Sequence, residues 1–515
     1  MKRPGWLIAV WAMGGIKLLT HFVSQIITPY GFHRDEFLYI AMGDHLHLWQ
    51  MDFPPFIAVA ANLQRFLFGD ALWAFRVLPA LAGAALVWIA MDTARRLGGK
   101  VAAQVLAGGI VLLCPLFLRT SVLFQPVVFD ELWWSLALWA LLRRGLDDDP
   151  RWWLGVGVAL GIGLFTKFSI GFLALPMAAA MLLTPLRKDL ATPWPWAGAV
   201  LSLIIGHPSL AGQAALGWPF FTQMAELQAT QLARVSFSGF LAEQVLMVGP
   251  GVLLAGVGAV WLVAGRGSPA HRGTGLAAIG AFAFLLFLHG KAYYAGPIYP
   301  VLVGAGAAGV SRFGATATPS VRLWLSRLAL GGVALAQLGY GVVGLPLGLP
   351  VLSPEPMARY AARLGVTEAT TSNRGEQLDL PQDYADMLGW EAFGDTVIRV
   401  WQELDPADRS RAVLFASNYG RAGALDWYGR PAGLPPVISN AGSYWFWGYG
   451  DKEWDVAVIA GSNVEDLRDY FREVTEVARI RDPWRVPEER DVPVFVVRGP
   501  YEPIATVWPR FEGQN

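Results

Sequence analysis

Long apolar segments alternate with short polar loops along roughly the first two thirds of the chain. A helix needs about 20 mostly apolar residues to cross the hydrocarbon core of a bilayer. By this measure, about eleven segments are candidate transmembrane helices. They lie near residues 5–28, 74–94, 101–118, 126–142, 152–166, 168–186, 195–211, 243–264, 275–290, 297–311 and 323–345. The pattern therefore predicts a polytopic α-helical membrane protein.

Positive charge recurs in every second loop between these segments, for example at Arg95 and Arg96 and again at Arg143 and Arg144. Loops rich in Lys and Arg face the cytoplasm by the positive-inside rule. The intervening loops, beginning with residues 29–73, are then predicted to face outward. We assign residues 1–345 to the transmembrane domain.

The pattern changes at residue 346, where charged helical stretches, turns and short apolar runs replace the long apolar segments. "AVLFASNYG" before "RAGALDWYG" predicts a strand and then a helix, and "DVAVIAGSN" before "VEDLRDYFREVTEV" repeats that order. "VPVFVVRG" predicts a last strand. Residues 346–515 are long enough for one small domain. We expect a soluble α/β domain on the extracytoplasmic side of the membrane, periplasmic in a bacterium.

Composition agrees with the membrane assignment and limits the partners. Hydrophobic residues make up 54% of the chain and charged residues 16%, against about 25% charged in a typical soluble protein. Lys plus Arg and Asp plus Glu are equal at 40 each, so the overall charge indicates neither a nucleic-acid nor an acidic partner. We expect no nucleic-acid partner. Cys114 is the only cysteine, which excludes an intrachain disulfide.

The first outer loop concentrates acids and histidines beside the first apolar segment, in "GFHRDEFLYIAMGDHLHLWQMDFPPF" at residues 31–56. Residues 35–47 are predicted to form one helix. Residues 56–67 carry a single apolar stripe, which is typical of a helix lying in the membrane interface. The loop alone also allows a simpler interpretation, in which Asp35 and Glu36 stabilise a helix N-terminus.

Several motifs, taken in order, resemble those of one enzyme class. They are the first-loop acids, the Asp-x-Pro-Pro at 52–55, "FGDALWAFRVLPAL", "FDELWWSLALWALL", "GLFTKFSIGFLALP" and "GKAYYAGPIYPVL". Together they resemble the GT-C integral membrane glycosyltransferases, specifically the protein O-mannosyltransferase-like and aminoarabinose-transferase-like group (family 39/83). The resemblance covers residues 30 to 305. It implies the GT-C fold in a bacterial inner membrane, with the active site on the periplasmic side.

The resemblance also implies an activity. Such enzymes move a sugar from a polyprenyl-phosphate donor to an acceptor hydroxyl of a glycolipid, polysaccharide or protein, usually with inversion. Asp35 falls on the family's first-loop acid and is the expected general base, with Glu36 as the second choice. Asp130 matches a second family acid and is the third expected catalytic residue.

Two lysines and two tyrosines at outer helix ends are expected to contact the donor phosphate. Lys167 matches the family lysine between the fifth and sixth spans, and Lys291 is similarly placed before Tyr293 and Tyr294. A lysine meets a phosphate as a point charge. Anchoring of these side chains at the membrane interface would explain the same pattern.

Asp52 falls where relatives carry an acid just before the proline, and there it is expected to help hold a divalent metal ion or the carrier head group. A turn-forming aspartate explains it equally well, and no other cofactor is expected. The aminoarabinose-transferase branch has a lysine after this acid, whereas this chain has Phe53. That departure argues against that particular activity.

Two other classes of protein stay open at this point. A transporter or flippase for lipid-linked sugars would also have many spans with charges inside them, although transporters often show paired halves. The sequence shows no such internal symmetry, and its candidate charges gather on one side. A non-catalytic assembly or sensor protein, with the C-terminal domain binding an envelope partner, is the third class.

Overall fold

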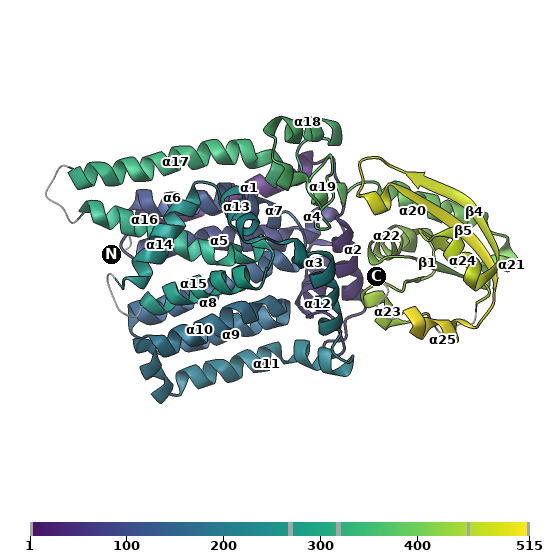
Figure 1. Cartoon of the computed structure of the whole chain (residues 1–515), viewed down its shortest axis with the longest axis horizontal. Coiled ribbons are helices and arrows are strands. Elements are labelled where there is room, and N and C mark those ends of the chain that lie inside the picture. Colours follow the sequence, from purple (N-terminus) through teal and green to yellow (C-terminus); the bar gives the residue numbers. More distant parts are fainter. Residues whose placement is uncertain (1–3, 266–270, 316–320, 451–453, 512–515) are drawn as a thin grey trace.

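The computed structural model describes residues 4–265, 271–315, 321–450 and 454–511. A bundle of long helices occupies one end of the molecule and a sheet domain the other (Figure 1). The long bundle helices are α1 (Pro4–Ile27), α5 (Val77–Arg96), α6 (Val101–Leu113), α8 (Pro126–Asp147), α9 (Trp152–Thr166), α10 (Gly171–Leu183), α11 (Trp194–Ala215), α13 (Phe237–Val248), α14 (Gly251–Val263), α15 (His271–Phe287), α16 (Tyr299–Ala315) and α17 (Val321–Gly348).

Shorter helices connect or cap the bundle. They are α2 (Arg34–Asp44), α3 (Phe56–Phe68), α4 (Leu72–Phe75), α7 (Pro115–Thr120), α12 (Pro219–Thr230) and the 3₁₀ segments η1 (Phe168–Ile170), η2 (Pro185–Ala191), η3 (Leu232–Arg234) and η4 (Ala292–Ile298). The first outer loop thus contains the two predicted helices, α2 and α3. Leu63, Phe66 and Leu67 of α3 are exposed, as expected of a helix lying in the membrane interface.

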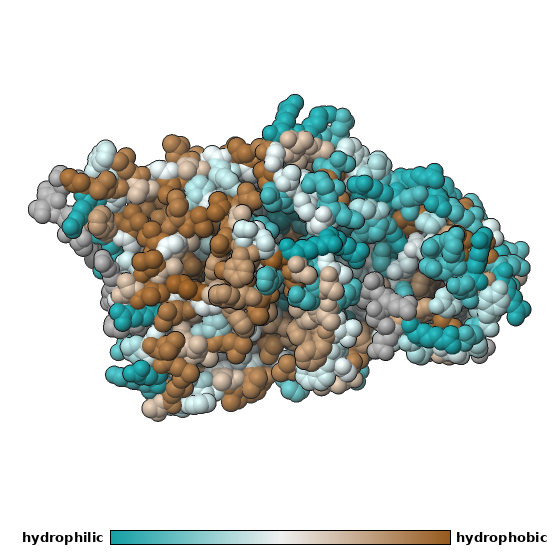
Figure 2. All heavy atoms as spheres, in the orientation of Figure 1, coloured by the Kyte–Doolittle hydropathy of each residue, from teal (hydrophilic) through white to brown (hydrophobic). Residues whose placement is uncertain are grey.

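The bundle has the length and hydropathy of a membrane domain. Among the described residues, Gly5–Ile27, Leu72–Arg96 and Val321–Gly348 are each long and apolar enough to cross a bilayer. If each of three bent helix pairs is counted as one span, the number rises to as many as six. The described residues also contain shorter apolar helices. Figure 2 shows an apolar surface over the bundle and a mostly polar surface over the sheet domain. The prediction of a polytopic helical membrane protein is confirmed, whereas the number of eleven crossings stays a prediction.

Several predicted spans are not single straight helices. The segment 243–264 is divided between α13 and α14, which meet at an angle of 110°. Gly249 there has a φ of 68°, and Pro250 follows it. A left-handed glycine ends a helix, and a proline lacks the N–H that would continue it. The segment 101–118 is similarly divided before Pro115.

The C-terminal region contains a five-stranded mixed sheet in the order β2-β1-β3-β5-β4. The strands are β1 (Ala412–Ala416), β2 (Val437–Ile438), β3 (Val456–Ala460), β4 (Phe471–Arg481) and β5 (Asp491–Pro500). β1 pairs in parallel with β2 and β3, and β5 is antiparallel to β3 and β4. The helices around the sheet are α18 (Pro354–Leu364), α19 (Gln382–Ala385), α20 (Trp390–Glu403), α21 (Pro406–Arg409), α22 (Tyr419–Gly429), α23 (Ser443–Trp447), α24 (Val464–Tyr470) and α25 (Ile504–Val507), with 3₁₀ segments η5 (Thr367–Thr370), η6 (Arg430–Ala432), η7 (Pro487–Glu489) and η8 (Trp508–Phe511). The predicted α/β domain is confirmed.

One predicted helix of this domain is wrong in its second half. "VEDLRDYFREVTEV" begins as α24, but that helix ends at Tyr470 and β4 begins at Phe471. Val474, Thr475 and Val477 are β-branched, and such residues favour strands. Pairing with β5 supplies the backbone hydrogen bonds that a helix would otherwise have provided.

The first outer loop and the sheet domain share one hydrophobic core. This core contains Phe37 of α2, Trp390 of α20, and Leu414 of β1. A Cβ placed on Gly423 of α22 would lie 2.6 Å from the Cβ of Phe37, so α2 and α22 are in close contact. The sheet domain is therefore packed directly against the helix that carries Asp35.

Candidate active site

The N-terminus of α2 fixes the directions of Asp35 and Glu36. The Nδ1 atom of His33 accepts the N–H of Asp35 at 3.1 Å, and the Glu36 carboxylate accepts the N–H of His33 at 2.8 Å. This reciprocal capping satisfies two backbone donors at the helix start. Adjacent helical positions point in different directions, so the two acids enter different surroundings.

Glu36 is completely buried and fully hydrogen-bonded. Its two oxygens lie 2.9 Å and 2.7 Å from the guanidinium nitrogens of Arg76, and one also accepts the N–H of Phe124 at 2.8 Å. An acid held in this way has no lone pair directed to a substrate. Glu36 thus has the contacts of a framework residue, and its catalytic role stays a prediction.

Asp35 is more open, with 28% of its side chain exposed. Its Oδ1 accepts the hydroxyl of Tyr419 at 2.9 Å, whereas its Oδ2 lies 3.4 Å from Nε2 of Gln125. The second contact is long for a hydrogen bond. Oδ2 is therefore available to accept a proton, as a general base requires.

Asp130 lies in the first turns of α8 and is buried. It accepts the indole N–H of Trp134 at 3.0 Å and the hydroxyl of Ser169 at 2.6 Å. Lys167, two residues before Ser169, interacts electrostatically with it. Asp130 is thus placed beside the turn that presents Lys167.

Lys167 and Lys291 meet the two predicted tyrosines. Nζ of Lys167 lies 4.2 Å from the ring centre of Tyr294 and 5.6 Å from that of Tyr293, and Nζ of Lys291 lies 6.0 Å from the ring centre of Tyr293. Burial opposes ionisation of Tyr294, but the two ammonium groups together lower its pKa. The cluster is strongly cationic, which suits a phosphate.

The acid and the cations belong to one group of interacting residues. Tyr39, on the same face of α2 as Asp35, interacts electrostatically with both Asp35 and Tyr294. Lys291 interacts in the same way with Asp35, and Tyr294 with Asp130. These interactions link Asp35 to the lysine–tyrosine cluster electrostatically, whereas direct contacts join Asp130 to Ser169 and Lys167 to Tyr294.

Asp52 makes different contacts. It is buried, and both of its oxygens lie 2.8 Å from the hydroxyl of Ser443 in α23. Burial raises its pKa to about 6. Its side chain is directed to the sheet domain rather than to Asp35, and a metal at Asp52 stays a prediction.

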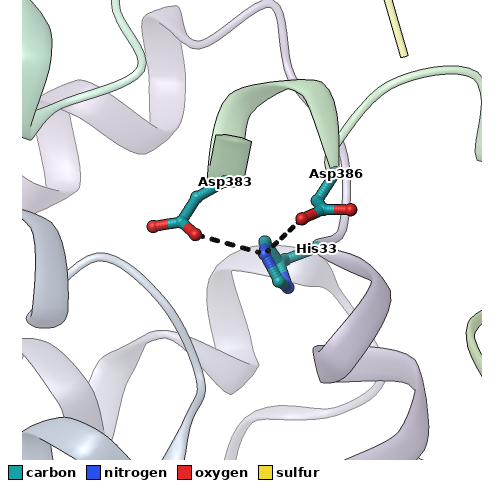
Figure 3. A group of neighbouring side chains, drawn as sticks. All are labelled: His33, Asp383 and Asp386. Carbon is teal, nitrogen blue, oxygen red and sulfur yellow. Dashed lines mark ion pairs between the residues drawn. The ribbon is translucent and has the colours of Figure 1, made fainter. Parts of the chain in front are cut away.

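A second group of polar residues joins α2 to the sheet domain (Figure 3). Nε2 of His33 lies 3.7 Å from both Asp383 and Asp386. One histidine and two aspartates can together hold a metal ion, and the ligand atoms of these three residues all lie within 4.8 Å of one another. However, in the neutral ring Nδ1 of His33 accepts the N–H of Asp35, which leaves the single ring proton on Nε2. In this tautomer no lone pair of His33 faces the two carboxylates.

The two carboxylates already have cationic partners. Arg119 donates to Asp383, and Nε of Arg34 lies 3.4 Å from Asp386. Burial opposes a positive charge on His33, but three neighbouring carboxylates outweigh it and raise the pKa of His33 to about 9. A protonated Nδ1 can no longer accept the N–H of Asp35, and it lies 3.9 Å from Oδ2 of Asp35, beyond hydrogen-bond distance. The group fits an ion-pair cluster between loop and sheet domain better than a metal site.

Sequence reasoning missed the partners of Asp35 that come from distant segments. Tyr419 is 384 residues away in the sequence, and Gln125 is 90 away. Tyr39 had a detectable signal, since it follows Asp35 at the i+4 spacing of a helix. Tyr419 had none, because its position depends on how the sheet domain packs.

Comparison with known proteins agrees with this architecture. Residues 52–211 match the family described as dolichyl-phosphate-mannose-protein mannosyltransferase. The crystal structure of ArnT from Cupriavidus metallidurans bound to undecaprenyl phosphate superposes with a TM-score of 0.60 at 19% identity, over 96% of this chain and 98% of that one. The chain has the GT-C fold.

Further structures support the GT-C fold. The apo form of the same ArnT gives a TM-score of 0.60 at 18% identity, over 95% of this chain and 98% of that one. The arabinofuranosyltransferase AftD from Mycobacteria gives 0.50 at 16% identity, over 97% of this chain and 40% of that one. Among curated proteins, none matches this sequence significantly.

Proposed function

We propose that this protein is a glycosyltransferase that moves a sugar from a polyprenyl-phosphate carrier to an acceptor hydroxyl. The acceptor belongs to a glycolipid, a polysaccharide or a protein, and transfer takes place at the outer, periplasmic face of a bacterial inner membrane. The GT-C fold supports this proposal, as does the likeness to ArnT bound to undecaprenyl phosphate.

One observation carries the proposal. A partly exposed carboxylate, Asp35, shares its electrostatic environment with Lys291, which lies with Lys167 and Tyr294 in the cationic cluster. The transfer needs both kinds of group: a base for the acceptor and cations for the departing phosphate. A carrier tail that stays in lipid would deliver its phosphate at the membrane surface, where outer helix ends meet the first loop.

The geometry suggests a single displacement. The acceptor oxygen attacks the anomeric carbon of the sugar while Oδ2 of Asp35 takes the hydroxyl proton. The bond from that carbon to the phosphate oxygen breaks, and the electron pair leaves with the carrier phosphate. Lys167 and Lys291 balance the charge of this phosphate, and Tyr294, whose ring centre lies 4.2 Å from Nζ of Lys167, donates a hydrogen bond to it. One displacement through a cation-like transition state inverts the anomeric centre.

Asp130 has a supporting part in this scheme. It is buried beside the turn of Lys167 and holds Ser169 by a hydrogen bond. Its carboxylate attracts the ammonium group of Lys167 and helps to orient it to the phosphate. Asp130 therefore acts on the donor side of the reaction, whereas Asp35 acts on the acceptor side.

Mass spectrometry of envelope glycolipids and glycoproteins, with and without the gene, tests the proposal. We expect one class of molecule to lose a sugar mass when the gene is deleted. The wild-type gene should restore that mass, and Asp35→Asn should not, although the variant inserts into the membrane. Asp70→Asn is the matched control, because Asp70 is an exposed acid of the same loop, paired with Arg65.

Two results would contradict the proposal. Wild-type product from Asp35→Asn would show that Asp35 is not the base. An unchanged envelope, together with movement of lipid-linked sugar across proteoliposomes that contain the protein, would identify a transporter instead.

A further inference from the structure

Asp35 receives its shortest side-chain hydrogen bond from the sheet domain and not from the bundle. Tyr419, the first residue of α22, donates its hydroxyl to Oδ1 at 2.9 Å. The bundle contributes Gln125, whose Nε2 lies 3.4 Å from Oδ2. One oxygen of the carboxylate is thus held firmly while the other is held loosely.

We propose that Tyr419 is a positioning residue for the transfer reaction: it fixes Oδ1 of Asp35 so that Oδ2 is directed to the acceptor hydroxyl. This inference rests on the proposed role of Asp35 as the general base. It makes the sheet domain part of the catalytic apparatus, because one of its residues orients the base.

The start of α22 is itself held in place. Asn418 caps the helix by accepting the N–H of Arg421 at 2.8 Å, and its side-chain amide donates to Glu489 at 2.8 Å. Nε of Arg421 donates to the same Glu489 at 2.9 Å. Each hydrogen bond of this network involves a charged side chain or a backbone N–H, and hydrogen bonds to charged groups are strong. The start of α22, and with it Tyr419, is therefore held firmly.

Two glycines let α22 approach α2 closely enough for the hydroxyl to reach Asp35. A Cβ on Gly420 would lie 3.1 Å from the Cβ of Arg34, and one on Gly423 would lie 2.6 Å from the Cβ of Phe37. Both distances are shorter than ordinary carbon contacts. Larger residues at these positions would separate the helices and withdraw the phenol from the carboxylate.

Tyr419 remains a hydrogen-bond donor throughout the working pH range. Burial raises its pKa, and the adjacent carboxylate of Asp35 raises it further. A donor to a carboxylate favours the ionised form, which is the form that a base needs. The other groups facing Asp35 are His33, Arg34 and Tyr39 of its own segment, Gln125, and at longer range Lys291 and Asp386.

The test is Tyr419→Phe in the full-length protein, assayed in membranes of the native host, which contain donor and acceptor. Loss of a hydrogen bond to a charged group should lower kcat about tenfold. The KM for the acceptor should change little, because the tyrosine acts through Asp35. The acidic limb of the pH–rate profile should move to higher pH, since the carboxylate loses a partner that favoured its ionised form.

A second variant keeps the test decisive if Tyr419→Phe inserts poorly. Replacement of Tyr419 by 3-fluorotyrosine preserves the shape and makes a stronger donor, so the acidic limb should move to lower pH. Tyr428→Phe is the matched control, because Tyr428 lies further along α22 and contacts Phe37. It should leave both kcat and the pH profile unchanged.

The outcomes separate this inference from the proposed function. An inactive Asp35→Asn together with a wild-type rate and pH profile for Tyr419→Phe would overturn the role of Tyr419 alone. An active Asp35→Asn would overturn the base assignment and this inference with it. If Tyr419→Phe lowers the amount of inserted protein and the 3-fluorotyrosine variant shows no shift of the acidic limb, Tyr419 has only a structural role.

Discussion

At the scale of single residues, the adjacent acids Asp35 and Glu36 differ in exposure and in hydrogen-bond partners. Asp35 has a side chain 28% exposed, with one oxygen loosely held. Glu36 is completely buried against Arg76, which contacts both of its oxygens. The difference arises because consecutive helical positions point to different sides. Two acids within one helical turn therefore have different surroundings, one partly open and the other enclosed.

Glu36→Gln should destabilise the protein. The substitution keeps the shape but leaves the buried Arg76 without its counter-charge, which costs about 3–5 kcal/mol. Thermal unfolding in detergent should show a clearly lower midpoint than that of the wild type. Asp35→Asn should lower the midpoint less, because the side chain of Asp35 is partly exposed. Unchanged stability of Glu36→Gln, combined with loss of transfer, would make Glu36 a catalytic residue after all.

At the scale of elements, the contact between α2 and α22 brings the sheet domain to Asp35. α2 belongs to the first outer loop, and α22 follows a strand of the sheet domain. Their contact places Tyr419 beside Asp35 and buries Phe37 in the shared core. A small change in the separation of these two helices would therefore change the hydrogen bond between Tyr419 and Asp35.

Gly423→Ala should separate α22 from α2. The new Cβ would lie 2.6 Å from the Cβ of Phe37, which is too close for any two side chains, so one helix must move. We expect lower transfer activity and a lower unfolding temperature. Gly331→Ala in α17 is the control, because open space surrounds that position and alanine favours a helix. Full activity of Gly423→Ala would show that this close contact is not needed.

At the scale of the whole molecule, ion pairs join the bundle side to the sheet domain. Arg34 lies 2.9 Å from Glu488 and 3.4 Å from Asp386, while Arg119 pairs with Asp383. His33 lies between the two aspartates (Figure 3). These partners come from segments that are far apart in the sequence, so their pairing depends on the domains being docked.

The docking should depend on pH through His33. Its pKa rises from the usual 6.5 to about 9 in the folded protein. The resulting stabilisation is fully present below pH 6.5 and is lost as the pH rises through about 9. The shift corresponds to roughly 3 kcal/mol at most.

Thermal unfolding at the two ends of this pH range measures the effect. The wild type should unfold at a lower temperature on the alkaline side. In His33→Gln, which does not titrate, this difference between the two pH values should shrink. An equal pH dependence in both proteins would show that His33 does not couple docking to pH.

The sequence by itself determined the class of the molecule and most of its elements. Long apolar segments must be shielded from water, so they predict a membrane domain wherever they occur. The alternation of short apolar runs and helical stretches likewise predicted β1, α22, β3 and β5. The predictions failed at particular short stretches. A glycine and a proline interrupt the segment 243–264, and the end of one predicted helix, which is rich in β-branched residues, forms the strand β4.

Only the tertiary structure decided which of the candidate residues work together. It separated Asp35 from Glu36, and it directed Asp52 towards Ser443. It also brought Tyr419 to Asp35 across 384 residues of sequence. Periodicity records which side of an element is apolar, but it holds no information on which distant element covers that side. Contacts between distant segments arise from packing, because close-packed side chains and buried ion pairs fix the domains to each other.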